Sequence, residues 1–338
     1  MSQAHVERSR SPARGTVSPR DIERLSKSSQ SIIARGSKSF AHASRLLPPA
    51  LRPSVHMLYA WCRHCDDVID GQELGHSTGQ QPSHDEQLRL LDALERDTAK
   101  ALDGEATSGV FAGLGFVFDR HHIDRRYPSQ LLTGLRMDVE GRNYERIEDL
   151  LEYCYCVAGT VGLMMATVMG VRSLPHLRCA CDLGIAFQLT NVARDLVADH
   201  RAGRIYVPLE WLDQVELPRD AMTDPAQRSK LSSIATRLLS MADLYYSSAA
   251  NGLPALGFRS AWSVATAKVV YRAIGVEILR RGPLAWNERV SVSVLKKILG
   301  TGEGLIEAAR SSAPGRSSSQ PMRSGLWTPG ILRSLEDN

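Results

Sequence analysis

The feature of this sequence that most constrains its fold is a set of polar residues at four-residue spacing. Asn191, Asp195 and Asp199 follow one another at intervals of four, which places their side chains on one face of an α-helix. We call these three residues the second acidic stripe. Carboxylates at this spacing weaken an isolated helix by about 0.2–0.5 kcal/mol, and an all-oxygen set suits a hard cation such as Mg²⁺ or Mn²⁺. The spacing alone also fits a solvated acidic helix face.

A second pair of carboxylates favours the metal-binding interpretation. Asp66 and Asp70, the first acidic stripe, are also four residues apart and follow another apolar, helix-like segment. An arginine lies beside each stripe, Arg63 in one case and Arg194 in the other. Arginines pair with phosphate oxygens in a bidentate manner, and divalent ions stabilise a departing diphosphate. Two such helices on opposite sides of a cavity therefore predict a site that ionises a diphosphate ester.

Apolar residues at helical spacing recur through most of the chain between residues 21 and 309. The segments with this pattern include 51–69, 85–102, 128–139, 147–169, 224–249, 262–281 and 290–309. No useful length of alternating strand pattern occurs, and no internal repeat beyond the two stripes. The sequence predicts one all-α domain with a central cavity. We expect a disordered tail at residues 1–20 and a largely disordered tail at residues 310–338.

The net charge of +4 belongs to the two ends of the chain. Residues 1–20 carry +3 and residues 310–338 carry +2, which leaves the body between them at −1. A nucleic-acid partner is not expected because the body has no excess of basic residues. No apolar run approaches the roughly 18 residues of a membrane span, and the N-terminus lacks the apolar core of a secretory signal. We expect a cytoplasmic protein that can attach peripherally to a membrane surface.

Six cysteines lie at positions 62, 65, 154, 156, 179 and 181. The Cys62-x-x-Cys65 pair with His64 is reminiscent of half a zinc site, but the other four form C-x-C pairs within apolar helical patterns. We interpret them as buried, reduced thiols.

Five short motifs occur together between roughly residues 30 and 300. They are Gly-Ser-Lys-Ser-Phe at 36–40, Trp-Cys-Arg-His-Cys-Asp-Asp-Val-Ile-Asp at 61–70, Tyr-Cys-Tyr-Cys-Val-Ala-Gly-Thr-Val-Gly at 153–162, Ala-Phe-Gln-Leu-Thr-Asn-Val-Ala-Arg-Asp at 186–195, and Gly-Arg-Ile-Tyr-Val-Pro at 203–208. Their sequences and their order resemble the squalene and phytoene synthase family of head-to-head prenyl synthases, bacterial members above all. The resemblance implies the isoprenoid-synthase helical fold. It also implies joining two geranylgeranyl diphosphates through prephytoene diphosphate into phytoene, the first committed step of carotenoid biosynthesis.

The resemblance assigns site roles by motif position. It implies metal binding by Asp66, Asp70, Asn191, Asp195 and Asp199. It implies catalytic roles for Arg63, Arg194, Gln188 and Tyr153, the last matching a tyrosine that steadies a cation or handles a proton. It implies substrate contacts by Ser37, Ser39, Phe40, Tyr59, Arg204 and Tyr206. Simpler structural interpretations also exist, since Ser37 and Ser39 can cap a helix and Tyr153 and Gln188 can be core residues with satisfied hydrogen bonds.

The resemblance further implies cofactors and partners. A divalent cluster of Mg²⁺ or Mn²⁺ is expected, ATP enters as a further cofactor by resemblance alone, and NADPH is not expected. Geranylgeranyl diphosphate is the expected substrate. A membrane surface and other enzymes of the carotenoid pathway are expected contacts.

The chemistry implied by the resemblance requires a dry cavity, because water quenches a carbocation. Small residues near the motifs are predicted to leave room for prenyl tails: Gly159, Gly162, Ala166, Ala186, Val192 and Ala193. The rings of Phe40, Tyr153 and Phe187 are predicted to stabilise positive charge. The small residues Ala41, Ala43 and Ser44 predict a tunnel deep enough for a twenty-carbon tail.

Three alternatives remain open at the level of sequence. The first is a squalene or dehydrosqualene synthase that uses fifteen-carbon farnesyl diphosphate. The second is a terpene cyclase, against which the motifs at 153–162 and 203–208 argue. The third is an inactive helical scaffold of the same fold, against which the two intact acidic stripes argue.

Overall fold

The computed structural model describes residues 18–74, 76–77, 79, 82–105, 108–313, 323 and 325–334. Its architecture is all-α, as the sequence predicts. The N-terminal helices are α1 (Pro19–Gly36), α2 (Lys38–Ser44), α3 (Arg52–Asp70), α4 (His84–Asp103), α5 (Gly109–His121) and α6 (Arg126–Val139). The C-terminal helices are α7 (Ile147–Cys154), α8 (Thr160–Val168), α9 (Leu174–Arg201), α10 (Leu209–Gln214), α11 (Arg228–Ala250), α12 (Phe258–Arg281), α13 (Val294–Ser311) and α14 (Gly330–Ser334).

Short elements connect these helices. Strand β1 (Gln72–Glu73) pairs antiparallel with β2 (His76–Ser77) directly after α3. A π-helical turn, η1 (Tyr155–Gly159), joins α7 to α8. Single 3₁₀ turns occur at η2 (Arg219–Ala221), η3 (Pro225–Gln227), η4 (Leu253–Ala255) and η5 (Gly282–Trp286).

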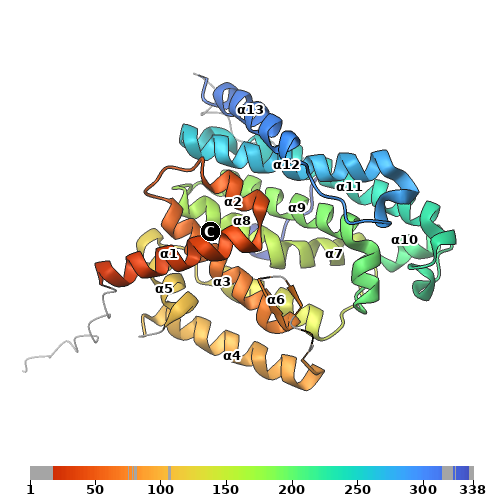
Figure 1. Ribbon diagram of the computed structural model, residues 1–338, viewed down its shortest axis with the longest axis horizontal. Coiled ribbons are helices and arrows are strands. Elements are labelled where there is room, and N and C mark those ends of the chain that lie inside the picture. The colour runs from red at the N-terminus through yellow and green to blue at the C-terminus, as the bar shows by residue number, and fades with distance from the viewer. Residues whose placement is uncertain are drawn as a thin grey trace, which may run out of the picture.

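The 28-residue helix α9 lies at the centre of the molecule, with α8, α11 and α12 packed against it (Figure 1). Its backbone approaches the continuous segment of α7, η1 and α8 very closely. A Cβ atom at Gly162 would lie 2.2 Å from the carbonyl oxygen of Ala180, and one at Gly184 would lie 2.2 Å from that of Ala158. Only glycine permits this approach, so the two glycines fix the position of the helix that carries the second acidic stripe.

Both acidic stripes lie in the last turns of their helices. Gly71, with a left-handed φ of 60°, ends α3 immediately after Asp70. Helix α9 ends at Arg201, two residues after Asp199, and Gly203 follows with a φ of 80°. The C-terminal end of a helix carries partial negative charge that favours cations. The helix ends therefore add to the attraction of both stripes for a positively charged ligand.

The chain from Ile147 to Val168 forms one long apolar rod of α7, η1 and α8. Among the described residues it is the one helical stretch long and apolar enough to cross a membrane, although the sequence analysis found no run of that length. Buried residues make up 67% of its apolar window, and it contains part of the functional motifs. We therefore assign it to the core. The π-helical turn within it is a feature that often marks functional sites.

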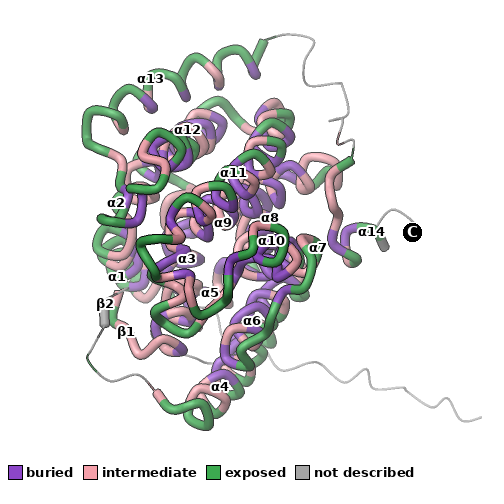
Figure 2. Tube along the Cα trace, turned by 90° about the vertical axis from the view of Figure 1, so that its right-hand side faces the viewer, coloured by how far each residue is buried: buried purple, intermediate pink, exposed green. Residues whose placement is uncertain are grey.

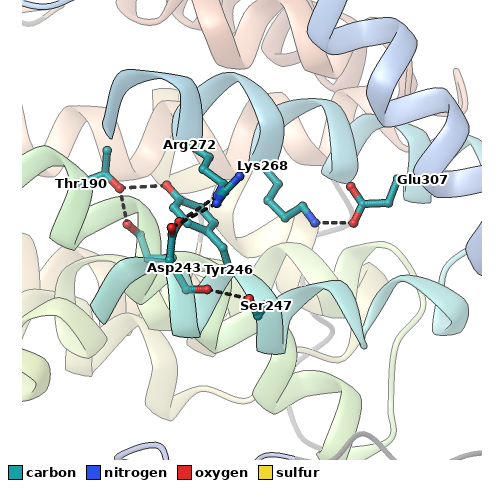
Figure 3. Close-up of polar contacts among 8 residues, drawn as sticks. Thr190, Asp243, Tyr246, Ser247, Lys268, Arg272 and Glu307 are labelled. Carbon is teal, nitrogen blue, oxygen red and sulfur yellow. Dashed lines mark hydrogen bonds and ion pairs between the residues drawn. The ribbon is translucent and has the colours of Figure 1, made fainter. Parts of the chain in front are cut away.

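Helix α13 forms the outermost layer on one side of the molecule (Figures 1 and 2). Arg272 of α12 donates to the carboxylate of Asp243 on α11 at 2.8 and 3.1 Å. Lys268 of α12 pairs with Glu307 of α13 (Figure 3). These pairs link α11 to α12 and α12 to α13, so α13 is held to the rest of the fold through α12.

The C-terminal segment differs in part from the predicted largely disordered tail. Helix α13 continues to Ser311, and within the segment beyond it Leu332 is buried. Arg323 donates through Nε and Nη2 to the two carboxylate oxygens of Asp182, each at 2.6 Å. Asp182 is a fully buried residue of α9, and the arginine that pairs directly with it is 141 residues away in sequence. Residues 1–17 and the remainder of the C-terminal tail lie outside the described residues.

The six cysteines are all free thiols, and all except Cys62 are buried. Burial raises the pKa of each thiol above its usual value. The predicted burial is therefore confirmed for five of the six thiols, whereas Cys62 is only half-buried.

Candidate active site

A cavity of about 640 Å³ lies between helices α2, α3, α8, α9 and α12. Nine of the fifteen predicted site residues line it: Ser37, Ser39, Phe40, Tyr59, Arg63, Asp66, Gln188, Asn191 and Arg194. Much of the remaining wall is apolar and includes Met165, Met169, Leu183, Leu253 and Leu256. The cavity thus combines charged and polar groups with an apolar section, as a prenyl diphosphate requires.

The first acidic stripe is supported by a neighbouring carboxylate. Arg63 donates to Asp67 Oδ1 through Nε at 2.9 Å and through Nη2 at 2.7 Å, while Asp67 Oδ2 accepts from the Leu74 backbone N–H at 2.8 Å. Asp67 therefore orients Arg63 and anchors the turn after α3. Burial raises the pKa of Asp66 to about 7, with Arg63 opposing the shift and Asp70 adding to it.

The second acidic stripe is partly neutralised by arginines. Arg194 donates through Nε to Asp195 Oδ1 at 2.9 Å and through Nη2 to Asp195 Oδ2. Arg289 reaches Asp195 Oδ2 at 3.4 Å. Burial opposes ionisation of Asp195, but these arginines hold its pKa below the usual value. Burial and the charge of Asp195 raise the pKa of Asp199 to about 7.

The six other predicted residues do not line the cavity: Asp70, Tyr153, Asp195, Asp199, Arg204 and Tyr206. Two of them contact Asp138 of α6, a residue that the sequence analysis did not predict, and two others pair with each other. Tyr153 and Tyr206 donate their hydroxyls to Asp138 at 2.9 and 2.7 Å, and their rings stack with centroids 4.9 Å apart. Arg204 pairs with Asp70. The Tyr153 hydroxyl is thus hydrogen-bonded to a carboxylate, and Tyr153 does not line the cavity.

The negative charge of Asp138 acts on a carboxylate of each stripe. Burial raises its pKa to about 6 although Arg204 opposes the shift. Its charge in turn contributes to the raised pKa values of Asp66 and Asp199. A cluster of carboxylates that raise each other's pKa is unfavourable without cations, so this arrangement favours a cationic ligand between the stripes.

The donor set fits divalent ions. The Oδ1 atom of Asn191 is buried and has no hydrogen-bond partner among the described residues, while its Nδ2 atom donates to Gln188 at 3.3 Å. No group of three or more His, Cys, Asp or Glu side chains within the described part of the chain is placed to hold one ion. Mg²⁺ needs no such group, because it commonly takes one or two carboxylates and completes its shell with phosphate oxygens and water.

We expect Asp66 and Asp199 to contribute a loss of stability to the metal-free protein as the pH rises from about 4 to about 7. Asp66 and Asp199 hold their protons more tightly in the folded state than in the unfolded chain. These two carboxyls therefore bind more protons in the folded state over this range, and through them raising the pH lowers the free energy of unfolding. Thermal melts in chelator across this pH range measure the effect, and millimolar Mg²⁺ should reduce it at the upper end.

The double variant Asp66→Asn with Asp199→Asn is the control for this pH dependence. Its amides do not titrate, so its melting temperature should fall less than that of the wild-type protein as the pH rises from about 4 to about 7. A slope equal to that of the wild-type protein would show that other groups cause the pH dependence.

Two further residues belong to the site and were not predicted. Tyr271 of α12 lines the cavity, with its ring 4.3 Å from Phe187 and 5.3 Å from Phe40 between centroids. Arg289 lines the cavity as well. Nothing local in the sequence around Tyr271 or Arg289 marks them, whereas Asp138 interrupts an otherwise apolar helix face and offered a signal.

Some predicted residues have a structural role as well as a place in the cavity. Ser37 caps α2 by accepting from the Phe40 backbone N–H at 3.3 Å, and it also lines the cavity. Ser37 is therefore a helix cap that also faces the cavity, and its contact with substrate stays a prediction.

The prediction about small residues is correct for only part of the set. Gly162 and Ala166 line the cavity. The other four, Gly159, Ala186, Val192 and Ala193, are buried in the core and are not part of the cavity wall. Small side chains on α9 serve mainly to bring helices close together.

Comparison with known proteins agrees with this fold. The family model for squalene/phytoene synthase matches residues 33–296. A 15-cis-phytoene synthase of Paracoccus sp. is 49% identical over 297 residues, which cover 88% of this chain and 95% of the relative. A 15-cis-phytoene synthase of Pantoea ananas is 46% identical and covers 83% and 93%, respectively. Among solved structures, that of a dehydrosqualene synthase in complex with ligand has a TM-score of 0.78 at 27% identity, covering 86% of this chain and 99% of that one.

The chain belongs to the squalene/phytoene synthase family, so it has the isoprenoid-synthase fold and is a prenyltransferase. Within the family, its identity of 46–49% to curated bacterial phytoene synthases supports phytoene synthase function. The expectation drawn from the five motifs is thereby confirmed at the level of family and reaction.

Proposed function

We propose that this enzyme condenses two molecules of geranylgeranyl diphosphate head to head into 15-cis-phytoene, through prephytoene diphosphate, with release of two diphosphates. The observation that carries the proposal is a cavity in which Asp66, Asn191 and three arginines share the wall with a long apolar section. The identity to curated phytoene synthases supports the choice of reaction. The overall reaction is redox-neutral and ends with loss of a proton, so it needs no reductant.

The protein's own groups bind and orient the diphosphates. Arg63, which Asp67 holds in place, and Arg194 present guanidinium groups to phosphate oxygens. The two stripes and Asn191 would hold Mg²⁺ or Mn²⁺, which would neutralise the departing diphosphate. An ion held by Asp195 would balance the charge of that carboxylate, so Arg194 would be available to bind the substrate diphosphate.

The cavity wall protects the carbocation that ionisation leaves behind. Phe40, Phe187 and Tyr271 form a cluster of rings there, and aromatic faces stabilise positive charge without acting as nucleophiles. Tyr153 and Tyr206 both donate to Asp138, so we assign them to positioning the metal-binding end of the site and to relaying the lost proton to that carboxylate.

Several finer aspects belong to the proposal. We place the enzyme in the cytoplasm and at a membrane surface, since the substrate carries a long prenyl tail and the product is an insoluble hydrocarbon. Contact with other enzymes of the carotenoid pathway is an expectation of the resemblance. The expected use of ATP has no support from the relatives or from the described residues, and we do not propose it.

A fifteen-carbon substrate is the second candidate. The similarity to the solved dehydrosqualene synthase favours it, because the fold is shared across 86% of this chain. We propose that the depth of the cavity near α2 decides whether a twenty-carbon or only a fifteen-carbon tail fits. Ala43 and Ser44 line the cavity there, whereas Ala41, on the same helix, does not.

We expect Ser44→Phe to shift the substrate preference toward farnesyl diphosphate. Ser44 is buried, accepts or donates a 3.1 Å hydrogen bond with His56, and faces the cavity, so a phenyl ring fills space that a twenty-carbon tail needs. The measurement is a competition between the two diphosphates, scored by the carbon number of the products. The wild-type enzyme should yield mainly the forty-carbon hydrocarbon.

Ala41→Phe is the control, because it adds the same ring on the same helix outside the cavity wall. It should leave the product ratio unchanged. If a folded Ser44→Phe enzyme also kept the wild-type ratio, the cavity near α2 would not set the chain length.

A further inference from the structure

Helix α13 exposes a continuous apolar face. Six large apolar side chains on it are between 39 and 74% exposed: Val294, Leu295, Ile298, Leu299, Leu305 and Ile306. Their spacings of one, three, four, seven and eleven residues place them on one side of the helix. We call this set the α13 apolar face. In Figure 2 α13 is exposed along most of its length. More than half of the exposed large apolar side chains of the described residues lie on this one helix.

The opposite side of α13 is locked against α12. A Cβ at Gly304 would lie 2.5 Å from Thr266 Oγ1, and one at Gly300 would lie 3.2 Å from a Val270 methyl group. The pair between Lys268 and Glu307 fixes the same orientation (Figure 3). The helix therefore cannot turn its apolar face inward without separating from the domain, so the face is not a misplaced part of the core.

Positive charge gathers at one end of the α13 apolar face. Arg280, Arg281 and Lys296 all pair with the single carboxylate of Glu277, at 2.6, 2.9 and 3.1 Å. Three cations against one anion leave an excess of +2 at the end of α12 and the start of α13. The exposed side chains of Val276, Leu279 and Leu284 lie on the same stretch of chain, so apolar and basic groups occur together there.

The chain leading into α13 also forms part of the substrate cavity. Residues 290–292 and Lys297 line the cavity wall, while Val294 and Leu295 between them point to solvent. This part of the argument rests on the proposed function: a substrate with a twenty-carbon tail and a forty-carbon hydrocarbon product must pass between the cavity and a lipid phase. The α13 apolar face is continuous with the segment that borders that cavity.

We propose that α13 docks on an anionic lipid bilayer. Its apolar face lies at the boundary between headgroups and acyl chains, and Arg280, Arg281 and Lys296 contact lipid phosphates. The excess positive charge complements anionic headgroups. Because α13 is close to the cavity wall, docking would bring the cavity near the lipid phase that holds substrate and product. A second copy of the chain is the competing occupant of the same face.

The test is flotation of the full chain with vesicles of phosphatidylcholine and phosphatidylglycerol. The wild-type protein should float with these vesicles. The fraction that floats should fall at high salt or with vesicles of phosphatidylcholine alone. Ile298→Glu and, separately, Ile306→Glu should each reduce the bound fraction at least about tenfold, because each adds a charge where an apolar side chain enters the bilayer. Leu244→Glu is the matched control, since Leu244 on α11 is 60% exposed against 58% for Ile298. It should float as the wild-type protein does.

Several outcomes would overturn the proposal. They are a wild-type protein that does not float, both α13 variants floating normally, and flotation that is lost on deleting residues 1–20 but not in the α13 variants. A change of oligomeric state in Ile298→Glu without a change in flotation would assign the face to a second copy. Turnover of geranylgeranyl diphosphate in detergent micelles is measured in parallel. A protein that floats but is inactive there would contradict the proposed function alone, and one that is active but does not float would contradict the docking alone.

Discussion

Replacement of Asp195 by asparagine should reduce turnover by at least about 10²–10³-fold, the range found when one preorganised group that stabilises a developing anion is removed. Asp195 is the centre of the second acidic stripe and accepts from both Arg194 and Arg289. Asparagine keeps the shape but removes the charge that an ion would balance. The variant should remain folded by far-UV circular dichroism, and Mn²⁺ titrated in the presence of inorganic diphosphate should bind more weakly.

Asp243→Asn is the matched control for this variant. Asp243 is also an aspartate paired with an arginine, Arg272, but it lies on the surface of α11 and belongs to neither acidic stripe. It should keep near-normal turnover. Near-normal rates in Asp195→Asn at saturating Mg²⁺ would contradict the metal-binding role of the second stripe.

The largest effect on stability is expected from Arg323→Ala. Asp182 is fully buried, and the Arg323 side chain opposite it is only 10% exposed. Removing one partner of a buried ion pair typically costs about 3–5 kcal/mol, because the remaining charge is left without compensation. Ser248 still donates to Asp182 at 2.6 Å and cannot neutralise it. Thermal and denaturant unfolding of the full chain measure the loss.

Two variants separate this charge effect from a general loosening of the C-terminal segment. Arg333→Ala removes an exposed arginine from the same segment, where it donates only to the Thr328 carbonyl, and should cost much less. Adding Asp182→Asn to Arg323→Ala should recover part of the stability, since no buried charge then remains. Equal losses in Arg323→Ala and Arg333→Ala would show that the Asp182 pair is not the cause.

Local spacing explains what the sequence alone could predict. Helical periodicity is a property of neighbouring residues, so the all-α fold and the two stripes could be read directly from the chain. The arginine at position 63 also follows from local geometry, since its partner Asp67 is four residues away.

Long-range pairing explains what the sequence alone could not predict. Arg204 reaches Asp70 across 134 positions, and Arg323 reaches Asp182 across 141. No periodicity links such residues, because they meet only after helices have packed. The same holds for Arg289, which approaches Asp195 from the loop after α12. The small residues of α9 were misjudged for a related reason, since spacing does not distinguish a side chain facing a cavity from one facing another helix.

Identification of the product is the most direct test of the proposed reaction. The purified enzyme is incubated with Mg²⁺ and either geranylgeranyl or farnesyl diphosphate, without NADPH, and the hydrocarbon and released diphosphate are quantified. We predict a forty-carbon hydrocarbon with a conjugated triene and a 15-cis double bond, formed from geranylgeranyl diphosphate with two diphosphates released per product. A thirty-carbon product from farnesyl diphosphate as the preferred reaction, or no metal-dependent release of diphosphate from either substrate, would contradict the account.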